Sequence, residues 1–70
     1  GNANQALAYI KAALDKMPQN PIYNYHMGMV LSRIGRIEEA REKLATAVKG
    51  DERYYGREEA ERALLGLKKQ

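Results

Sequence analysis

The sequence contains no cysteine and a single histidine, His26. Disulfide bonds, thiolate catalysis and cysteine-based metal sites are therefore excluded, and one histidine is too few for a histidine-rich metal site. No apolar run approaches the roughly 18 residues that span a membrane, and no segment has the order of regions found in a signal peptide. We therefore expect a soluble segment that needs no metal or cofactor and does not insert into a membrane. Its cellular compartment stays open.

Strand-forming residues are also scarce, because phenylalanine and tryptophan are absent and valine and threonine are few. The frequent residues are alanine, leucine, glutamate, lysine and arginine, which are good helix formers. With 44% apolar and 30% charged residues among 70, the composition is that of one small globular domain. The net charge is only +3 and basic residues alternate with acidic ones, so no stripe for nucleic acid is evident. The composition predicts an all-α protein that does not bind nucleic acid.

An internal repeat becomes visible when the chain is shifted against itself by 34 positions. Four pairs of residues then match in size and character. These pairs are Ala6 with Ala40, Ile10 with Leu44, Ala13 with Ala47, and Leu14 with Val48. A period of this length is typical of a helix–turn–helix repeat that stacks into a solenoid.

Helix-capping and helix-breaking residues divide the chain into four predicted helical segments. Asn20 is a favoured N-cap and Pro21 suits the first position of a helix, whereas Pro18, Gly35 and Gly50 each end one. Apolar residues recur at three- and four-residue steps within every segment. The segments cover about residues 3–17, 21–34, 37–49 and 57–69. Because the links between them are short, neighbouring helices are expected to be antiparallel.

The second and third segments resemble the tetratricopeptide repeat, which pairs an apolar–glycine motif in its first helix with small residues around a bulky one in its second. The matching residues are Met27, Gly28, Leu31, Ala40, Leu44 and Ala47. Two positions depart from the pattern. Asn24 replaces a large apolar residue, so Tyr23 or Tyr25 is expected to cover that spot, and Glu52 replaces a proline.

The resemblance implies a division of the chain and a way of stacking. Residues 21–54 would form one full repeat, residues 3–17 the second helix of an incomplete repeat, and residues 57–69 a C-terminal capping helix. The helix pairs of such proteins stack into a right-handed superhelical solenoid. The stretch 54–60 also looks like the C-terminal ending of some bacterial repeat proteins, so we expect the C-terminal part of a longer bacterial solenoid.

Enzyme chemistry is not expected. Ser32 lies six residues from His26 on the same predicted helix, which is outside the three- and four-residue steps that bring helical side chains together. The acidic residues Glu38, Glu39 and Glu42 are expected on a solvated face, where Glu39 would pair with the lysine four residues on. No glycine-rich phosphate loop follows a strand. The sequence therefore predicts a binding protein.

In the family that the chain resembles, first-type helices line a concave groove that holds an extended peptide or a partner helix. The positions that carry over to this sequence are Ile22, Tyr25, Met29, Ser32 and Arg33. Methionine and tyrosine are suited to such surfaces because one is adaptable and the other amphipathic. In an alternative interpretation, Tyr25 and Met29 do not bind a partner but pack against the last helix. The lysine and asparagine clamp that some members use for a C-terminal carboxylate is not supported.

Two functions remain open. The first is a protein–protein interaction module that binds a peptide or helix of an unidentified protein partner. The alternative is a structural C-terminal cap or a self-association element of a longer solenoid, with no ligand of its own. The first segment favours some self-association, because Leu7, Tyr9 and Ile10 are expected to leave apolar surface that could support a weak two-fold homodimer.

Overall fold

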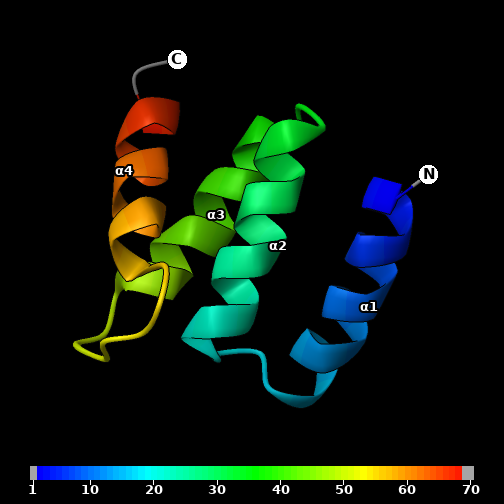
Figure 1. The fold of residues 1–70 in the computed structure, drawn as a ribbon, viewed down its shortest axis with the longest axis horizontal. Helices are drawn as coiled ribbons and strands as arrows, with labels where there is room; N and C mark the ends of the chain where they lie inside the picture. Colours follow the sequence, from blue (N-terminus) through cyan, green and yellow to red (C-terminus); the bar gives the residue numbers. More distant parts are fainter. Residues whose placement is uncertain (1, 69–70) are drawn as a thin grey trace.

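The structure is a computed structural model that describes residues 2–68, and it contains four α-helices and no strand within these residues (Figure 1). The helices are α1 (Asn2–Lys16), α2 (Pro21–Arg33), α3 (Ile37–Val48) and α4 (Arg57–Lys68). The predicted all-α fold is confirmed, and the helix ends fall within one residue of the predicted ones. The expected last residue of the fourth helix, Lys69, lies outside the described residues.

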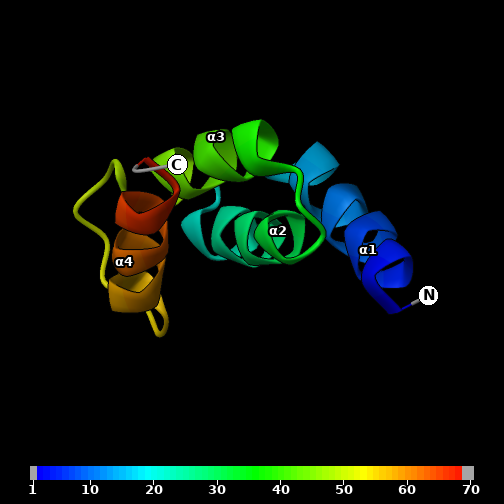
Figure 2. The same ribbon diagram turned by 90° about the horizontal axis from the view of Figure 1, so that it is seen from above.

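The helices α2 and α3 form a central antiparallel pair, and the other two helices flank it. Helix α1 packs against α2, while α4 packs mainly against α3. Figures 1 and 2 show α1 and α4 at opposite ends of the molecule. The side chain of Arg41 on α3 also reaches α4, where its Nη2 donates a 3.0 Å hydrogen bond to the carbonyl of Leu67. Each helix is thus held by the next one in the chain.

The start of α2 is fixed by two asparagine side chains. The Asn20 side chain accepts a hydrogen bond of 2.9 Å from the backbone N–H of Tyr23, so Asn20 is the N-cap that the sequence predicts. Asn24 is buried and its Nδ2 donates to the carbonyls of Pro18 at 3.1 Å and Asn20 at 2.8 Å. The amide thus ties α2 to the preceding turn, while Tyr23 and Tyr25 on either side of it are half-buried against the core.

Small residues let α2 and α3 approach closely. At the position of Gly28 an added Cβ would lie 2.6 Å from Cγ of Leu44, which is shorter than any normal contact. Ala40 and Leu44 are 0% exposed and Ala47 is 1% exposed. The predicted repeat residues therefore lie at a close crossing of α2 and α3, and the crossing requires a glycine-sized residue at position 28.

The turn between α2 and α3 depends on a left-handed glycine. Gly35 has φ of +86°, and the following Arg36 N–H donates to the carbonyl of Leu31 at 2.9 Å. The guanidinium of Arg36 then forms two hydrogen bonds of 2.7 Å with the carboxylate of Glu39. The predicted pairing of Glu39 with Lys43 is therefore replaced by a bidentate pair with Arg36. The planar guanidinium group of an arginine fits a carboxylate better than the ammonium group of a lysine does.

Candidate functional site

The link from α3 to α4 is held in place by two side chains that bind backbone carbonyls at the end of α3. The hydroxyl of Tyr54 donates to the carbonyl of Ala47 at 2.7 Å, and Nη2 of Arg57 donates to that of Val48 at 2.9 Å. Nη1 of Arg57 donates to the carbonyl of Glu52 at 2.9 Å. Because the last carbonyls of a helix have no partners within the helix, these bonds fix the path of the link.

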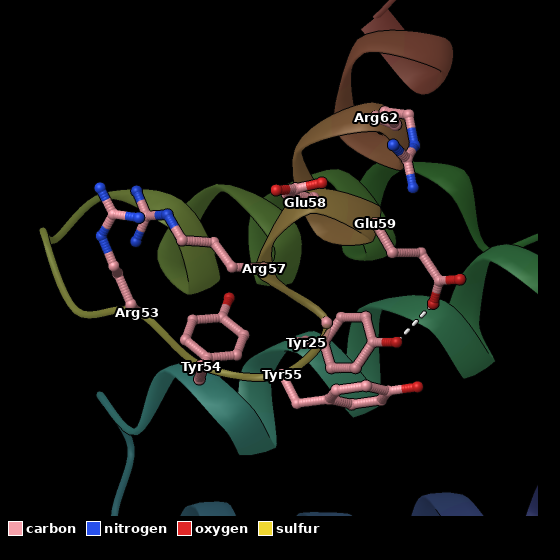
Figure 3. A pocket seen from close by; sticks show the side chains of 9 residues that line it. Tyr25, Arg53, Tyr54, Tyr55, Arg57, Glu58, Glu59 and Arg62 are labelled. Carbon is pink, nitrogen blue, oxygen red and sulfur yellow. Dashed lines mark hydrogen bonds between the residues drawn. The ribbon is translucent and has the colours of Figure 1, made fainter.

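Tyr25 on α2 lies directly against this link. Its hydroxyl donates a hydrogen bond to the carboxylate of Glu59 on α4 (Figure 3). Its ring covers Gly56, where an added Cβ would lie 2.7 Å from Cε2 of the tyrosine. Gly56 has φ of +99°, so glycine is favoured there both by backbone conformation and by the lack of space.

An open pocket with a volume of about 520 Å³ lies beside Tyr25. Its wall combines aromatic, basic and acidic side chains from α2, from the α3–α4 link and from the first two turns of α4 (Figure 3). These side chains belong to Tyr25, Tyr54, Tyr55, Arg53, Arg57, Arg62, Glu58 and Glu59. The pocket can therefore offer aromatic surface and both signs of charge to a ligand.

Several groups in this pocket are available to a ligand and others are engaged. Tyr55 is 99% exposed, and neither Arg53 nor Arg62 forms an ion pair with any residue between positions 2 and 68. Arg57 is engaged with the link and also lies 3.6 Å from the carboxylate of Glu61. An extended chain crossing the pocket could stack on Tyr55 and meet one of the two unpaired guanidinium groups.

Two of the tyrosine hydroxyls in the pocket, those of Tyr25 and Tyr54, have raised pKa values. The hydrogen bond from Tyr25 to Glu59, together with burial and the nearby carboxylate charge, raises the pKa of Tyr25 from 10.0 to about 12. Burial also raises the pKa of Tyr54. Neither group is suited to act as a base near pH 7, and each hydroxyl already donates its proton within the fold. These two tyrosines therefore offer a ligand mainly aromatic contact surface.

The five predicted groove residues lie along one side of α2 but differ in environment. Ile22 and Arg33 are exposed, whereas Tyr25, Met29 and Ser32 are half-buried. Met29 packs against the hydrophobic core. Of the five, Tyr25 lines the pocket, and the other four extend from it along the helix.

Sequence reasoning did not identify the pocket residues of the link and of α4. A signal was present, because two tyrosines and a glycine precede the last helix, which begins with an arginine. Spacing alone could not show that Gly56 leaves room for Tyr25, which comes from a different helix. His26 is exposed and its ring centre lies 5.0 Å from that of Tyr25. Within residues 2–68 no cluster of acidic or histidine side chains is arranged to hold a metal ion.

The geometry is that of a helix–turn–helix repeat, and comparison with known proteins agrees. The sequence pattern of the tetratricopeptide repeat family matches residues 1–55. The chain therefore belongs to the tetratricopeptide repeat family, whose members are non-catalytic modules that generally mediate protein–protein interaction.

The match to the family pattern ends just before α4. No curated protein and no solved structure matched the chain. Among residues 2–68 no helix is both long and apolar enough to cross a membrane.

Proposed function

We propose that this chain binds an extended peptide or a helix of a partner protein along the outer side of α2. The binding residues would be Ile22, Tyr25, Met29, Ser32 and Arg33, as the sequence predicts. The observation that carries the proposal is the position of Tyr25, which belongs to this side of α2 and also lines the pocket beside it. The two surfaces therefore join, and a ligand could run from α2 across Tyr25 to Tyr55.

The proposal assigns a role to each part of the chain. Residues 21–54 act as one full repeat that presents the groove, and residues 3–17 as the second helix of an incomplete repeat. Residues 57–69 act as a capping helix that also supplies one wall of the pocket. The alternative, a structural cap or self-association element without a ligand, is favoured by the contact between Tyr25 and Glu59. That contact gives Tyr25 a packing role that needs no partner.

A displayed library of random peptides, selected on the purified chain, would test the proposal. We expect the selected peptides to bind Ile22→Ala and Arg33→Ala roughly tenfold more weakly, which is about 1.4 kcal/mol. Both side chains are exposed, so these variants should keep the fold. Ala45→Ser, on an exposed position of α3, serves as the control and should leave binding unchanged.

Two results would contradict the proposal. Selection that yields no peptide would favour the structural alternative. Peptides that bind both variants as tightly as the original chain would place the site elsewhere. An NMR titration would show where such peptides bind. If the proposal holds, the backbone amide shifts should change in α2 and in the link before α4; changes confined to other residues would identify a different site.

A further inference from the structure

The outer side of α2 carries no negative charge of its own. The sequence has no acidic residue between Asp15 and Glu38, and α2 lies entirely within this stretch. The helix has one strongly basic side chain, Arg33, which is exposed in its last turn. Arg33 follows Tyr25 and Met29 at steps of four residues, so the three side chains share one side of the helix. A ligand that lies along this side therefore meets a positive charge and no acidic group of α2.

Helix α4 brings a second arginine to the same place. Arg62 is exposed and lines the pocket together with Tyr25 (Figure 3). Arg33 also lies near this tyrosine: the hydrogen bond to Glu59 raises the pKa of the Tyr25 hydroxyl most, and the charge of Arg33 acts against it by lowering that pKa. Neither Arg33 nor Arg62 forms an ion pair within residues 2–68. Two unpaired guanidinium groups from different helices thus lie around one tyrosine.

The acidic side chains of the pocket wall leave this positive charge in excess. They are Glu58 and Glu59, and the carboxylate of Glu59 already accepts the hydrogen bond from Tyr25. Glu58 lies four positions before Arg62, but the two form no ion pair in the described part of the chain. Glu58 also borders a second hollow that it shares with the unpaired Arg53, so these two opposite charges offset each other. The balance on the α2 side of the pocket is therefore positive.

We propose that the partner segment is acidic, and that its aspartate or glutamate side chains bind Arg33 and Arg62 while the segment lies on Tyr25 and Met29. This inference rests on the proposed function, because it names the chemistry of the ligand held along α2. A guanidinium group suits a carboxylate since it can donate two parallel hydrogen bonds to it. The net charge of +3 also favours the approach of an acidic segment.

The arrangement of the helices indicates that the carboxylates belong to side chains and not to a chain end. Helices α2 and α4 run in the same direction in Figure 1. Arg33 lies in the last turn of α2 and Tyr55 lies just before α4, so they mark opposite ends of the combined surface. Arg62 lies between them, in the middle of α4. A segment that spans this surface passes Arg62, and the carboxylate it offers there comes from within the segment.

Peptides selected on the chain provide the probe, and each would be synthesised with an amidated C-terminus. We expect the selected peptides to be rich in aspartate and glutamate. Analogues in which asparagine and glutamine replace these residues should bind the original chain roughly tenfold more weakly. Raising the salt concentration from about 0.1 M to about 1 M should weaken the acidic peptides more than the analogues, because the Debye length falls from about 10 Å to about 3 Å.

Charge reversal at single positions locates the contact. Arg62→Glu and Arg33→Glu should each weaken an acidic peptide roughly tenfold, because a repulsion replaces an attraction. The uncharged analogue should lose much less affinity to Arg62→Glu, since it has no ionic contact to lose. Lys11→Glu is the matched control: it changes the net charge equally, at an exposed position of α1, at the opposite end of the molecule from α4 (Figures 1 and 2). It should leave binding within about twofold, and circular dichroism would verify that all variants fold.

The outcomes separate this inference from the proposed function. Neutral or basic peptides that perturb α2 and the link in the NMR titration would overturn the inference and leave the proposed function standing. The inference is also overturned if Arg62→Glu weakens an acidic peptide no more than Lys11→Glu does, or if the uncharged analogue binds as tightly as its parent. Binding that requires a free C-terminus would assign the carboxylate to a chain end and overturn it as well. A selection that yields no peptide would overturn both.

Discussion

The hydroxyl of Tyr25 on α2 donates a hydrogen bond to the carboxylate of Glu59 on α4, 34 positions later in the chain. This bond connects two helices that otherwise share few contacts, since α4 packs mainly on α3. The ring of the same tyrosine covers Gly56 at the entry to α4. One side chain therefore contributes both to the position of the last helix and to the wall of the pocket.

The first prediction concerns alkaline pH. The pKa of Tyr25 is raised from 10.0 to about 12, so the unfolded chain loses this proton first as the pH rises. A group with a raised folded-state pKa stabilises the fold fully below pH 10.0, and its contribution is lost between pH 10.0 and about 12. We expect the free energy of unfolding of the original chain to fall more steeply over this range than that of Tyr25→Phe.

Urea unfolding followed by circular dichroism at several pH values would measure the difference. Tyr55→Phe is the control, because it removes a fully exposed hydroxyl and should keep the steep alkaline loss. If Tyr25→Phe and the original chain lose stability in parallel above pH 10, the hydrogen bond to Glu59 does not contribute to the folded state.

The second prediction concerns the closest helix contact. Gly28→Ala would place a Cβ 2.6 Å from Cγ of Leu44 and 3.3 Å from its backbone nitrogen. Overpacking of this kind typically costs about 1–3 kcal/mol, which exceeds the gain of up to about 1 kcal/mol from better helix propensity. Gly66→Ala, in α4, has open space at its Cβ and should be neutral or slightly stabilising. Equal stabilities of the two variants in denaturant would refute the tight crossing.

Helices and core were predictable from the sequence because they depend on local and periodic signals. The cap at Asn20 and the stop at Gly35 lie next to the helix ends that they define. Ala40 follows from the repeat period, and Gly28 from the resemblance to the tetratricopeptide repeat. The environment of Asn24 was not predictable, since a buried amide is stable only when backbone carbonyls happen to face it. The pocket wall was missed for a similar reason: it joins α2 to a link more than two dozen positions later.

The third prediction concerns that buried amide. Asn24→Ala removes two hydrogen bonds and leaves the carbonyl of Pro18 without this partner. The loss of a buried hydrogen-bonding group typically costs about 1–3 kcal/mol. Asn4→Ala, at an exposed position of α1, should change stability by less than about 0.5 kcal/mol. Thermal unfolding of the two variants would compare them, and a shift of similar size in both would mean that the amide does not tie α2 to the turn.

The fourth prediction separates backbone strain from contact at the two left-handed glycines. Gly35 and Gly56 have φ of +86° and +99°, and an alanine in this region costs about 1–2 kcal/mol by itself. At Gly35 the added Cβ would meet nothing within 4 Å, whereas at Gly56 it would lie 2.7 Å from the ring of Tyr25. Gly56→Ala should therefore destabilise the chain by about 1–3 kcal/mol more than Gly35→Ala.

The same pair of substitutions made in a Tyr25→Ala background completes the fourth prediction. Once the ring is gone, the Cβ at position 56 no longer meets it, and only the strain common to both glycines remains. We therefore expect the difference between Gly56→Ala and Gly35→Ala to shrink to within about 0.5 kcal/mol, the usual limit for sites that do not interact. A difference that persists without the ring would mean that Gly56 is required for the path of the link alone. The packing of Tyr25 would then be a consequence of that path, and α4 would keep its position without the tyrosine.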